Sequence, residues 1–231
     1  FYRGNTTLNA QRVISIIGTR KCSDYGRDLC ESFIRDLAAQ FPDTHIVSGL
    51  AYGIDICAHR AALKHGLPTI GVLAHGLDRI YPSVHRNTAA QMTSHGGLLT
   101  EYVSCTEPER QNFLQRNRIV AGMADATVVI ESAAKGGALV TASIANSYGR
   151  DCYAFPGRTY DTASAGCNRL IRLNQAGLIT SADDFIEAMM WSPAQAPKPE
   201  AIQRSLFLDL NEDESHIVEL LAKQEEGVHI N

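Results

Sequence analysis

The sequence has no long apolar run and no organised set of cysteines or histidines. None of its hydrophobic segments approaches the roughly 20 residues needed to cross a bilayer, and we expect no signal peptide. Its 6 cysteines include no C-x-x-C pair, and its 8 histidines form no cluster with metal-ligand spacing. We therefore expect a cytoplasmic protein with free thiols and with no metal, cofactor or membrane partner.

Common catalytic motifs are also absent. The sequence contains no G-x-S-x-G nucleophile elbow, no H-E-x-x-H zinc motif and no G-x-x-x-x-G-K-[ST] phosphate loop. Asp55, Asp78, Glu101 and Glu131 stand near expected strand ends, but carboxylates at such positions more often cap helices or pair with arginines. The sequence therefore predicts a protein that is not an enzyme.

A strongly basic composition, which marks many nucleic-acid-binding proteins, is missing too. The 231 residues carry a formal net charge of −4. The charge is unevenly distributed, because residues 1–182 carry 18 Lys and Arg against 14 Asp and Glu, whereas residues 183–231 carry 3 against 11. The large first part of the chain can therefore hold a local basic patch, and the acidic end is a separate piece.

What the sequence does contain is a repeated order of strand, glycine turn and helix. Residues 13–17 are a nearly continuous β-branched run ending at Gly18, which is typical of a strand buried on both faces of a parallel sheet. Strands that alternate with helices predict an α/β fold with a doubly wound, mostly parallel sheet. The further strands are expected at residues 46–47, 69–73, 96–101, 127–131 and 152–155.

Apolar residues at helical spacing place the helices between these strands. Residues 102–115 contain Pro108 and show no clear periodicity, so we expect a loop there, with a helix entered from Phe113. The other helices are expected at about residues 29–37, 54–63, 83–92, 139–148 and 182–190.

The chain is expected to contain one large domain and the start of a second. Residues 1–190 form the first domain, and residues 191–207 have the proline-rich, polar composition of a linker. Residues 208–231 contain one amphipathic helix, at 210–224, which is too little to bury a core. We therefore expect this last piece to be the incomplete beginning of a small domain.

The glycine turns suggest where a ligand binds. In a doubly wound sheet the turns after the strands gather at one edge, where backbone amides and cationic side chains suit phosphate groups. Arg116 and Arg118 point in different directions on a helix, so we expect one to bind the ligand and the other to pair with Glu131 or Asp55. The candidate phosphate-binding residues are Gly18, Thr19, Arg20, Ser48, Gly49, Gly53, Arg116, Asn117, Arg118, Lys135, Gly136 and Gly137.

These turns also have a purely steric explanation. A strand-to-helix turn needs glycine in many α/β proteins, and Gly49 and Gly53 are not followed by the third glycine of the G-x-G-x-x-G fingerprint. The recurrence of the pattern favours anion binding over turn geometry alone.

Six motifs occur in an order typical of one family. They are Gly18-Thr-Arg20 with Ser23-x-Tyr25-Gly26, Ser48-Gly-Leu-Ala-x-Gly53-Ile-Asp55-x-x-Ala58-His59, Gly76-Leu-Asp78-x-x-Tyr81-Pro82, Phe113-x-x-Arg116-Asn-Arg118-Ile, Gly-x-Leu-x-Thr-Ala at 137–142, and Pro156-Gly157. Over about residues 10–180 the chain thus resembles the DNA-processing protein A family, also called DprA or Smf.

The resemblance implies an extended Rossmann-like domain that binds single-stranded DNA, protects incoming DNA and forms a homodimer. It also implies that the protein loads the RecA recombinase during natural transformation, and that residues 208–231 begin a winged-helix domain. The family's DNA pocket corresponds to Gly18, Thr19, Arg20, Ser48 and Gly49, and its Arg-Asn-Arg segment to residues 116–118. Rings that could receive bases are Tyr25, Tyr52 and Phe113.

Two departures from the family pattern concern individual contacts. Gly136-Gly137-Ala138-Leu139 stands where the family has Ser-Gly-Ser-Leu, so backbone amides would replace a hydroxyl, and Ala74-His75 replaces Gly-Thr. The alternative function is that of a nucleoside-monophosphate phosphoribohydrolase, an enzyme of related Rossmann fold. The Pro-Gly-Gly-x-Gly-Thr-x-x-Glu turn of those enzymes does not occur in this sequence.

Overall fold

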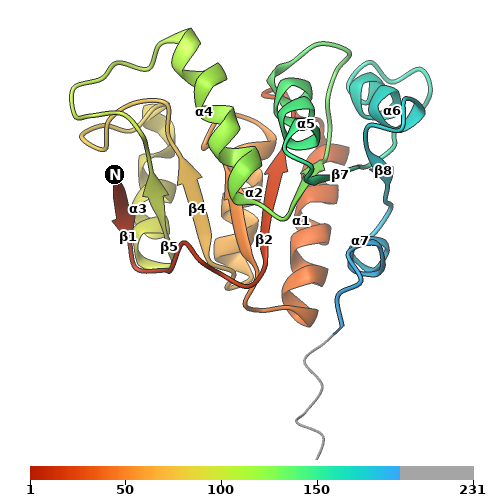
Figure 1. Cartoon of the computed structure of the whole chain (residues 1–231), viewed down its shortest axis with the longest axis horizontal. Helices are drawn as coiled ribbons and strands as arrows, with labels where there is room; N and C mark the ends of the chain where they lie inside the picture. Colours follow the sequence, from red (N-terminus) through yellow and green to blue (C-terminus); the bar gives the residue numbers. More distant parts are fainter. Residues whose placement is uncertain (193–231) are drawn as a thin grey trace, which may run out of the picture. The chain divides into compact units, whose positions relative to one another are not determined.

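The computed structural model describes residues 1–192, and its central feature is an eight-stranded sheet (Figure 1). The strands lie in the order β1-β5-β4-β3-β2-β6-β7-β8, and every neighbouring pair is parallel except β1 and β5. This architecture confirms the expected α/β Rossmann-like fold. The strands are β1 Tyr2–Gly4, β2 Val13–Ile17, β3 His45–Ser48, β4 Thr69–Val72, β5 Gly96–Leu99, β6 Ala126–Val129, β7 Asp151–Ala154 and β8 Gly177–Leu178.

Helices cover both faces of the sheet, which explains the nearly continuous apolar run in β2. Ile14 and Ile16 pack with residues of α1, α2 and α7, whereas Val13 and Ile17 pack on the opposite face with residues of α4, α5 and α6. The helices are α1 Asp24–Gln40, α2 Ile54–Lys64, α3 Arg86–Ser94, α4 Arg110–Met123, α5 Gly137–Ser147, α6 Ala165–Arg172 and α7 Ala182–Ala188, with a 3₁₀ turn, η1 Ser83–His85, before α3.

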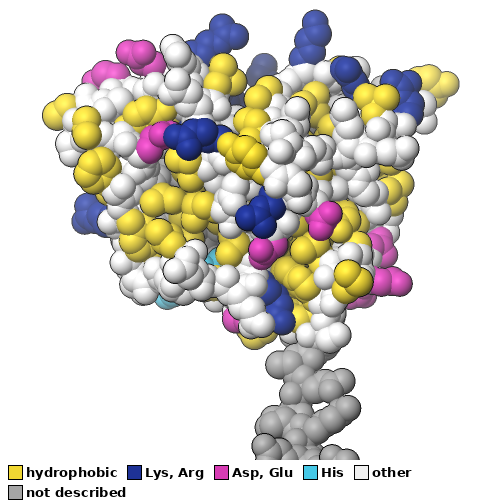
Figure 2. All heavy atoms as spheres, viewed as in Figure 1, with side chains coloured by type: hydrophobic (Ala, Val, Ile, Leu, Met, Phe, Trp, Pro, Cys, Tyr) yellow, Lys and Arg dark blue, Asp and Glu magenta, His cyan; other side chains and the backbone are white. Residues whose placement is uncertain are grey.

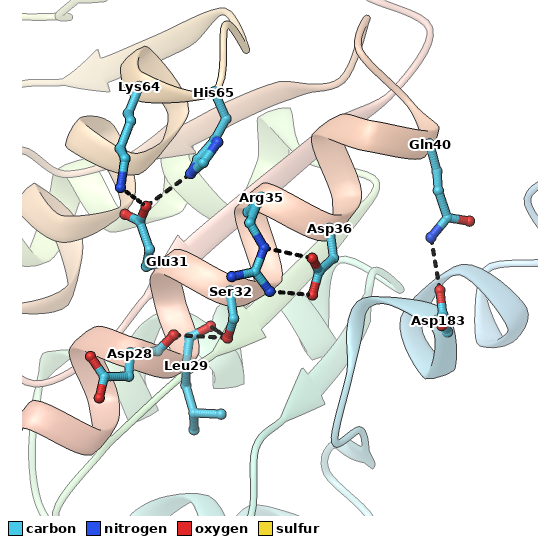
Figure 3. A network of polar contacts seen from close by, with 10 residues as sticks. All are labelled: Asp28, Leu29, Glu31, Ser32, Arg35, Asp36, Gln40, Lys64, His65 and Asp183. Atoms are coloured by element: carbon cyan, nitrogen blue, oxygen red, sulfur yellow. Dashed lines mark hydrogen bonds and ion pairs between the residues drawn. The ribbon is translucent and has the colours of Figure 1, made fainter.

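Polar side chains on α1 tie neighbouring helices to it (Figure 3). The Glu31 carboxylate accepts hydrogen bonds from Lys64 Nζ (2.5 Å) and His65 Nε2 (2.9 Å) at the end of α2, and these contacts lower the pKa of Glu31. Gln40 Nε2 donates to Asp183 Oδ1 of α7 (2.7 Å). Arg35 is paired with its neighbour Asp36 on the same helix. These surface contacts join α1 to α2 and α7, while its apolar residues hold it on the sheet.

The sheet reverses its direction of winding at β2. From β2 the chain builds β3, β4 and β5 on one side, and it returns to place β6, β7 and β8 on the other. The register joins Ser15 of β2 to Val47 of β3 and Ile17 of β2 to Val129 of β6. The carboxyl ends of β3, β2 and β6 therefore form the topological switch point, which is where doubly wound folds bind their ligands.

Some elements differ from the expectations. The prediction of a loop through residue 115 is wrong, because α4 already begins at Arg110. Its buried residues come only from Arg116 onward, so the first turn has no apolar face that periodicity could reveal. The short strands β1 and β8 and the helix α6 are further elements that the sequence pattern does not predict.

The sequence also leads to expectations about the C-terminal residues, membrane-spanning segments and the cysteines. The expected linker lies outside the described residues from residue 193 on, as does the expected helix at 210–224. None of the helices within residues 1–192 combines the length and the hydropathy that a bilayer-crossing segment requires. All six cysteines are free, and Cys105 is exposed to solvent.

Candidate functional site

A groove with a volume of about 830 Å³ lies at the switch point. Its walls come from the turns that follow β2, β3 and β6 and from one side of α4. Of the residues predicted as ligands, the lining contains Gly18, Thr19, Arg20, Gly49, Arg116, Asn117, Lys135, Gly136 and Gly137. The structure thus brings together segments that are more than 100 residues apart in the chain.

Glu131, directly after β6, holds the turn between β2 and α1 in place. The backbone N–H of Thr19 donates to Glu131 O (2.7 Å). The buried Glu131 carboxylate accepts from Ser23 N (2.9 Å) and Ser23 Oγ (2.6 Å), and the same Ser23 oxygen caps α1 by accepting from Gly26 N (3.1 Å). Glu131 is therefore a structural carboxylate that fixes the position from which Arg20 extends.

The lining of the groove is cationic. Arg20, Arg110 and Lys135 are exposed to solvent, and Arg116 lies beneath them. Asp55 supplies the single carboxylate of the lining and is 8% exposed. Four cationic groups against one buried carboxylate give the groove a positive potential, which favours a negatively charged ligand.

Arg116 forms the floor of the groove. Its side chain is 3% exposed, and Nη1 donates to Gly49 O (2.8 Å) and to Val72 O. A Cβ on Gly49 would lie 2.5 Å from the guanidinium nitrogens, so only glycine lets this turn pack so closely on the arginine. Burial lowers the pKa of Arg116 to about 10, and the group stays charged at neutral pH. Arg116 therefore positions the turns after β3 and β4.

Asp55, in the first turn of α2, faces this floor. Burial raises its pKa, and the nearby Arg116 charge and the backbone N–H groups of Ala51 and Gly49 oppose that shift. These two amides are directed at the Asp55 carboxylate, although Gly49 was predicted to bind phosphate. Of the two carboxylates expected near an arginine, Asp55 is the one whose charge interacts with Arg116.

The beginning of α5 offers backbone amides that no side chain occupies. Gly136 is the N-cap of this 11-residue helix, and it makes no side-chain capping bond. Lys135, Gly136 and Gly137 are all exposed at the groove. The helices α2 and α4, which also reach the groove, begin without side-chain caps as well. A free helix N-terminus beside a lysine is a favourable position for an anion.

Flat side chains form one wall of the groove. The Arg20 guanidinium lies 5.4 Å from the centroid of the Phe113 ring, and that ring is 5.8 Å from Tyr81, tilted by 55°. Tyr81 is 47% exposed. Sequence reasoning did not single out Tyr81 or Arg110 as ligands. Tyr81 belongs to the family motif that begins at Gly76, and this membership could have indicated it. Arg110 lies two residues after Pro108, in a segment that was expected to be a loop.

Three predicted ligands lie outside the lining of the groove. Ser48 is fully buried, and its Oγ donates to Ile16 O (2.6 Å). Gly53 caps α2 with a φ of 78°, a backbone conformation that favours glycine. Arg118 points to solvent and pairs with Glu101. The two other candidate rings also serve elsewhere: Tyr25 donates to Pro156 O (2.9 Å), and Tyr52 packs on His85.

The fold and this groove define a class: a Rossmann-like α/β protein with a cation-lined groove at its switch point. The family model of DNA recombination-mediator protein A matches residues 1–190. The chain belongs to this family, also called DprA or Smf, as its motifs indicated.

Relatives from three bacteria illustrate the match. A curated relative from Mycobacterium tuberculosis is 43% identical over 178 residues, which are 77% of this chain and 45% of the relative. The X-ray structure of DprA from Streptococcus pneumoniae superposes with a TM-score of 0.76 at 38% identity, over 81% of this chain and 65% of that one.

A structure of DprA from Helicobacter pylori gives a TM-score of 0.75 at 30% identity and covers 82% of this chain and 85% of that one. It describes the single-stranded DNA binding mode of the H. pylori protein. The present chain spans less than half of the length of the first of these relatives.

Proposed function

We propose that the groove binds single-stranded DNA and that the protein acts as a non-enzymatic mediator of recombination. The observation that carries this proposal is the combination, in one groove, of exposed cations, an uncapped helix start and two rings, the half-buried Phe113 and the exposed Tyr81. A phosphate ligand alone would need only the first two. The rings add surfaces on which bases can stack.

The rings favour single-stranded over double-stranded DNA. Phe113 and Tyr81 stand beside the Arg20 guanidinium, and all three present flat faces. Bases in a duplex are stacked on one another and hide their faces, whereas a single strand can turn its bases toward such a wall. The H. pylori relative, which is described as a single-stranded DNA binder, supports the same choice.

Phosphates would bind at two cationic positions in the groove. Lys135 and the amides at the start of α5 form one position, and Arg20 and Arg110 form a second. In this arrangement Arg116 supports the turns and does not contact the strand, because its Nη1 already binds two carbonyl oxygens. Membership of the family supports three further parts of the proposal: protection of incoming DNA, loading of RecA in natural transformation, and homodimerisation through the Rossmann-like domain.

A dimer would compensate for the small number of cations in each groove. Three exposed cations per groove predict a modest affinity for one site. Two grooves that hold one strand raise the effective concentration of the second contact and strengthen binding without any new interaction. Sedimentation of the protein with and without a long oligonucleotide tests the dimer, and the rate of RecA-driven strand pairing tests the loading step.

The proposal is tested with Arg20→Ala. Loss of this guanidinium removes a phosphate contact and one face of the ring wall, so affinity for a labelled single strand should fall about tenfold. The dependence of affinity on salt should also become shallower, by about 0.7 in the logarithmic slope. Fluorescence anisotropy at several salt concentrations measures both quantities, with a matched duplex as the second ligand.

Arg35→Ala is the control, because it removes the same charge from the outer surface of α1 (Figure 3). Its affinity should equal that of the wild type. Equal binding by Arg20→Ala and wild type at every salt concentration would contradict the assignment of the groove. Release of free base from nucleoside monophosphates by the wild-type protein would instead support the phosphoribohydrolase alternative.

A further inference from the structure

The loop between β7 and α6, residues 155–164, continues the rim beyond the groove. β7 is the neighbour of β6 in the sheet, and parallel strands lie about 4.8 Å apart. Two segments that line or adjoin the groove contact this region. Gly166 N, at the start of α6, donates to Ser132 O of the groove wall (2.7 Å), and the Tyr25 hydroxyl of α1 donates to Pro156 O (2.9 Å).

Internal hydrogen bonds hold the backbone of this loop in one conformation. Gly157 and the Asn168 side chain exchange two hydrogen bonds of 3.1 Å. The Asp161 carboxylate accepts from Ala163 N (2.9 Å) and from Ser164 Oγ (3.2 Å). The loop is therefore an ordered platform, and its one carboxylate is engaged within it.

This platform presents two side chains to solvent. Tyr160 is 97% exposed, and Arg158 is exposed beside it in the sequence. Within residues 1–192 the ion pairs involve other cations, so Arg158 keeps an unneutralised charge. A ring for a base and a guanidinium for a phosphate are the two groups that a single strand requires.

The opposite end of the groove is less suited to a polyanion. There Arg79 pairs with both Asp78 and Glu107, and Arg118 pairs with Glu101, so the cations are neutralised. In Figure 2 acidic side chains gather at the upper left, over the loop that leads into α4. Lys and Arg side chains stand along the rest of the upper margin, over α4, α5 and α6.

We propose that a single strand leaves the groove over the turn between β6 and α5 and continues across the loop between β7 and α6. One base stacks on Tyr160, and a phosphate near it binds Arg158. This inference rests on the proposed function, and it adds a direction to it: the strand runs from the switch point toward β7 and not toward β4.

Oligonucleotides of two lengths distinguish binding in the groove from binding on the loop between β7 and α6. An oligothymidine of about 6 nucleotides fills the groove, whereas one of about 18 also reaches the loop, in line with the site sizes of single-strand binders. In the double variant Arg158→Ala/Tyr160→Ala, affinity for the long oligonucleotide should fall about tenfold and affinity for the short one should not change. Tyr160→Phe should bind both like the wild type, because it keeps the stacking face.

Arg172→Ala on α6 is the matched control, since it removes an exposed arginine from the same region and should leave both affinities unchanged. Thermal unfolding confirms that each variant is folded. If the double variant binds both lengths like the wild type, the path toward β7 is wrong, while the groove assignment stands. If the wild-type protein binds neither length, the proposed function itself fails.

Discussion

The environment of each guanidinium near the groove decides what it can do. Arg116 is buried and directs its hydrogen bonds to Gly49 O and Val72 O, whereas Arg118 is half exposed and pairs with Glu101 at the surface. Arg20 is exposed and has a ring, not a carboxylate, as its neighbour. A buried arginine that satisfies backbone carbonyls stabilises the fold, while an exposed one without an acidic partner can exchange water for a phosphate.

Substitution of the two neighbouring arginines should separate these roles. Arg116→Ala leaves two buried carbonyl oxygens without a donor, so the free energy of unfolding should fall by about 3 kcal/mol or more. Arg118→Ala removes only a surface ion pair and should cost less than about 1 kcal/mol. Urea unfolding measures both values. A smaller loss for Arg116→Ala than for Arg118→Ala would contradict the structural role of Arg116.

At the scale of elements, the strands could be predicted and the start of α4 could not. β2, β3, β4 and β6 are buried on both faces, and their short runs rich in β-branched residues indicate strands of this kind. The first turn of α4 lines the groove with Arg110 and Phe113 and gives the core no buried residue, so hydrophobic periodicity cannot reveal it. α6 follows a long ordered loop that has no apolar period.

The conformation of the turn between β3 and α2 requires a glycine at position 53. Gly53 has a φ of 78°, and a Cβ there would collide with the backbone of Thr19 and Arg20, 2.6 Å from the Arg20 carbonyl carbon. Gly66 has nearly the same φ of 76°, but nothing lies within 4 Å of the position that a Cβ would take there. Alanine substitutions at Gly53 and Gly66 therefore distinguish the cost of backbone strain from the cost of a steric collision.

We expect Gly66→Ala to destabilise the protein by about 1 kcal/mol, which is the backbone strain alone. Gly53→Ala adds the collision and should cost about 3 kcal/mol. Because the collision displaces Arg20, Gly53→Ala should also weaken binding of single-stranded DNA, while Gly66→Ala should not. Unfolding and anisotropy on the two variants measure these effects, and equal losses in both would contradict the packing of this turn.

At the scale of the whole molecule, one buried histidine couples folding to pH. His59 is fully buried, and its Nδ1 donates to Thr69 Oγ1 (2.7 Å), because the Thr69 hydroxyl itself donates to Ile46 O. Burial, together with the charges of Arg116 and His85, lowers the pKa of His59 to about 3. Unfolding returns this pKa to about 6.5.

Between these two values the unfolded chain binds a proton that the folded chain does not. The free energy of unfolding should therefore be unaffected by His59 above about pH 6.5 and should fall by about 1.4 kcal/mol per pH unit below it. Urea unfolding at several pH values from 7 to about 4 measures the slope. In His59→Asn, which keeps the donor to Thr69, the slope should be shallower, and an unchanged slope would assign it to other groups.

The candidate site could be predicted in outline because topology alone gathers the turns at one edge. Sequence could not tell which amides are free, since the N–H groups of Gly49 and Ala51 look the same in the sequence as those of Gly136 and Gly137. Only coordinates show that Asp55 lies against the first pair and that no side chain caps the second. Tyr81 was missed because its partner Phe113 is brought to it by the fold.

The pairing of β2 with β6 has a consequence for how the molecule assembles. Ser15 and Thr127 share a buried hydrogen bond of 2.7 Å across 112 positions of the chain. Contacts of such high sequence separation close large loops, and topologies rich in them fold slowly. During synthesis the half from β2 to β5 can collapse while the segment with β6 is still inside the ribosome. The groove draws its walls from both halves, so it is complete only after β6 has paired with β2.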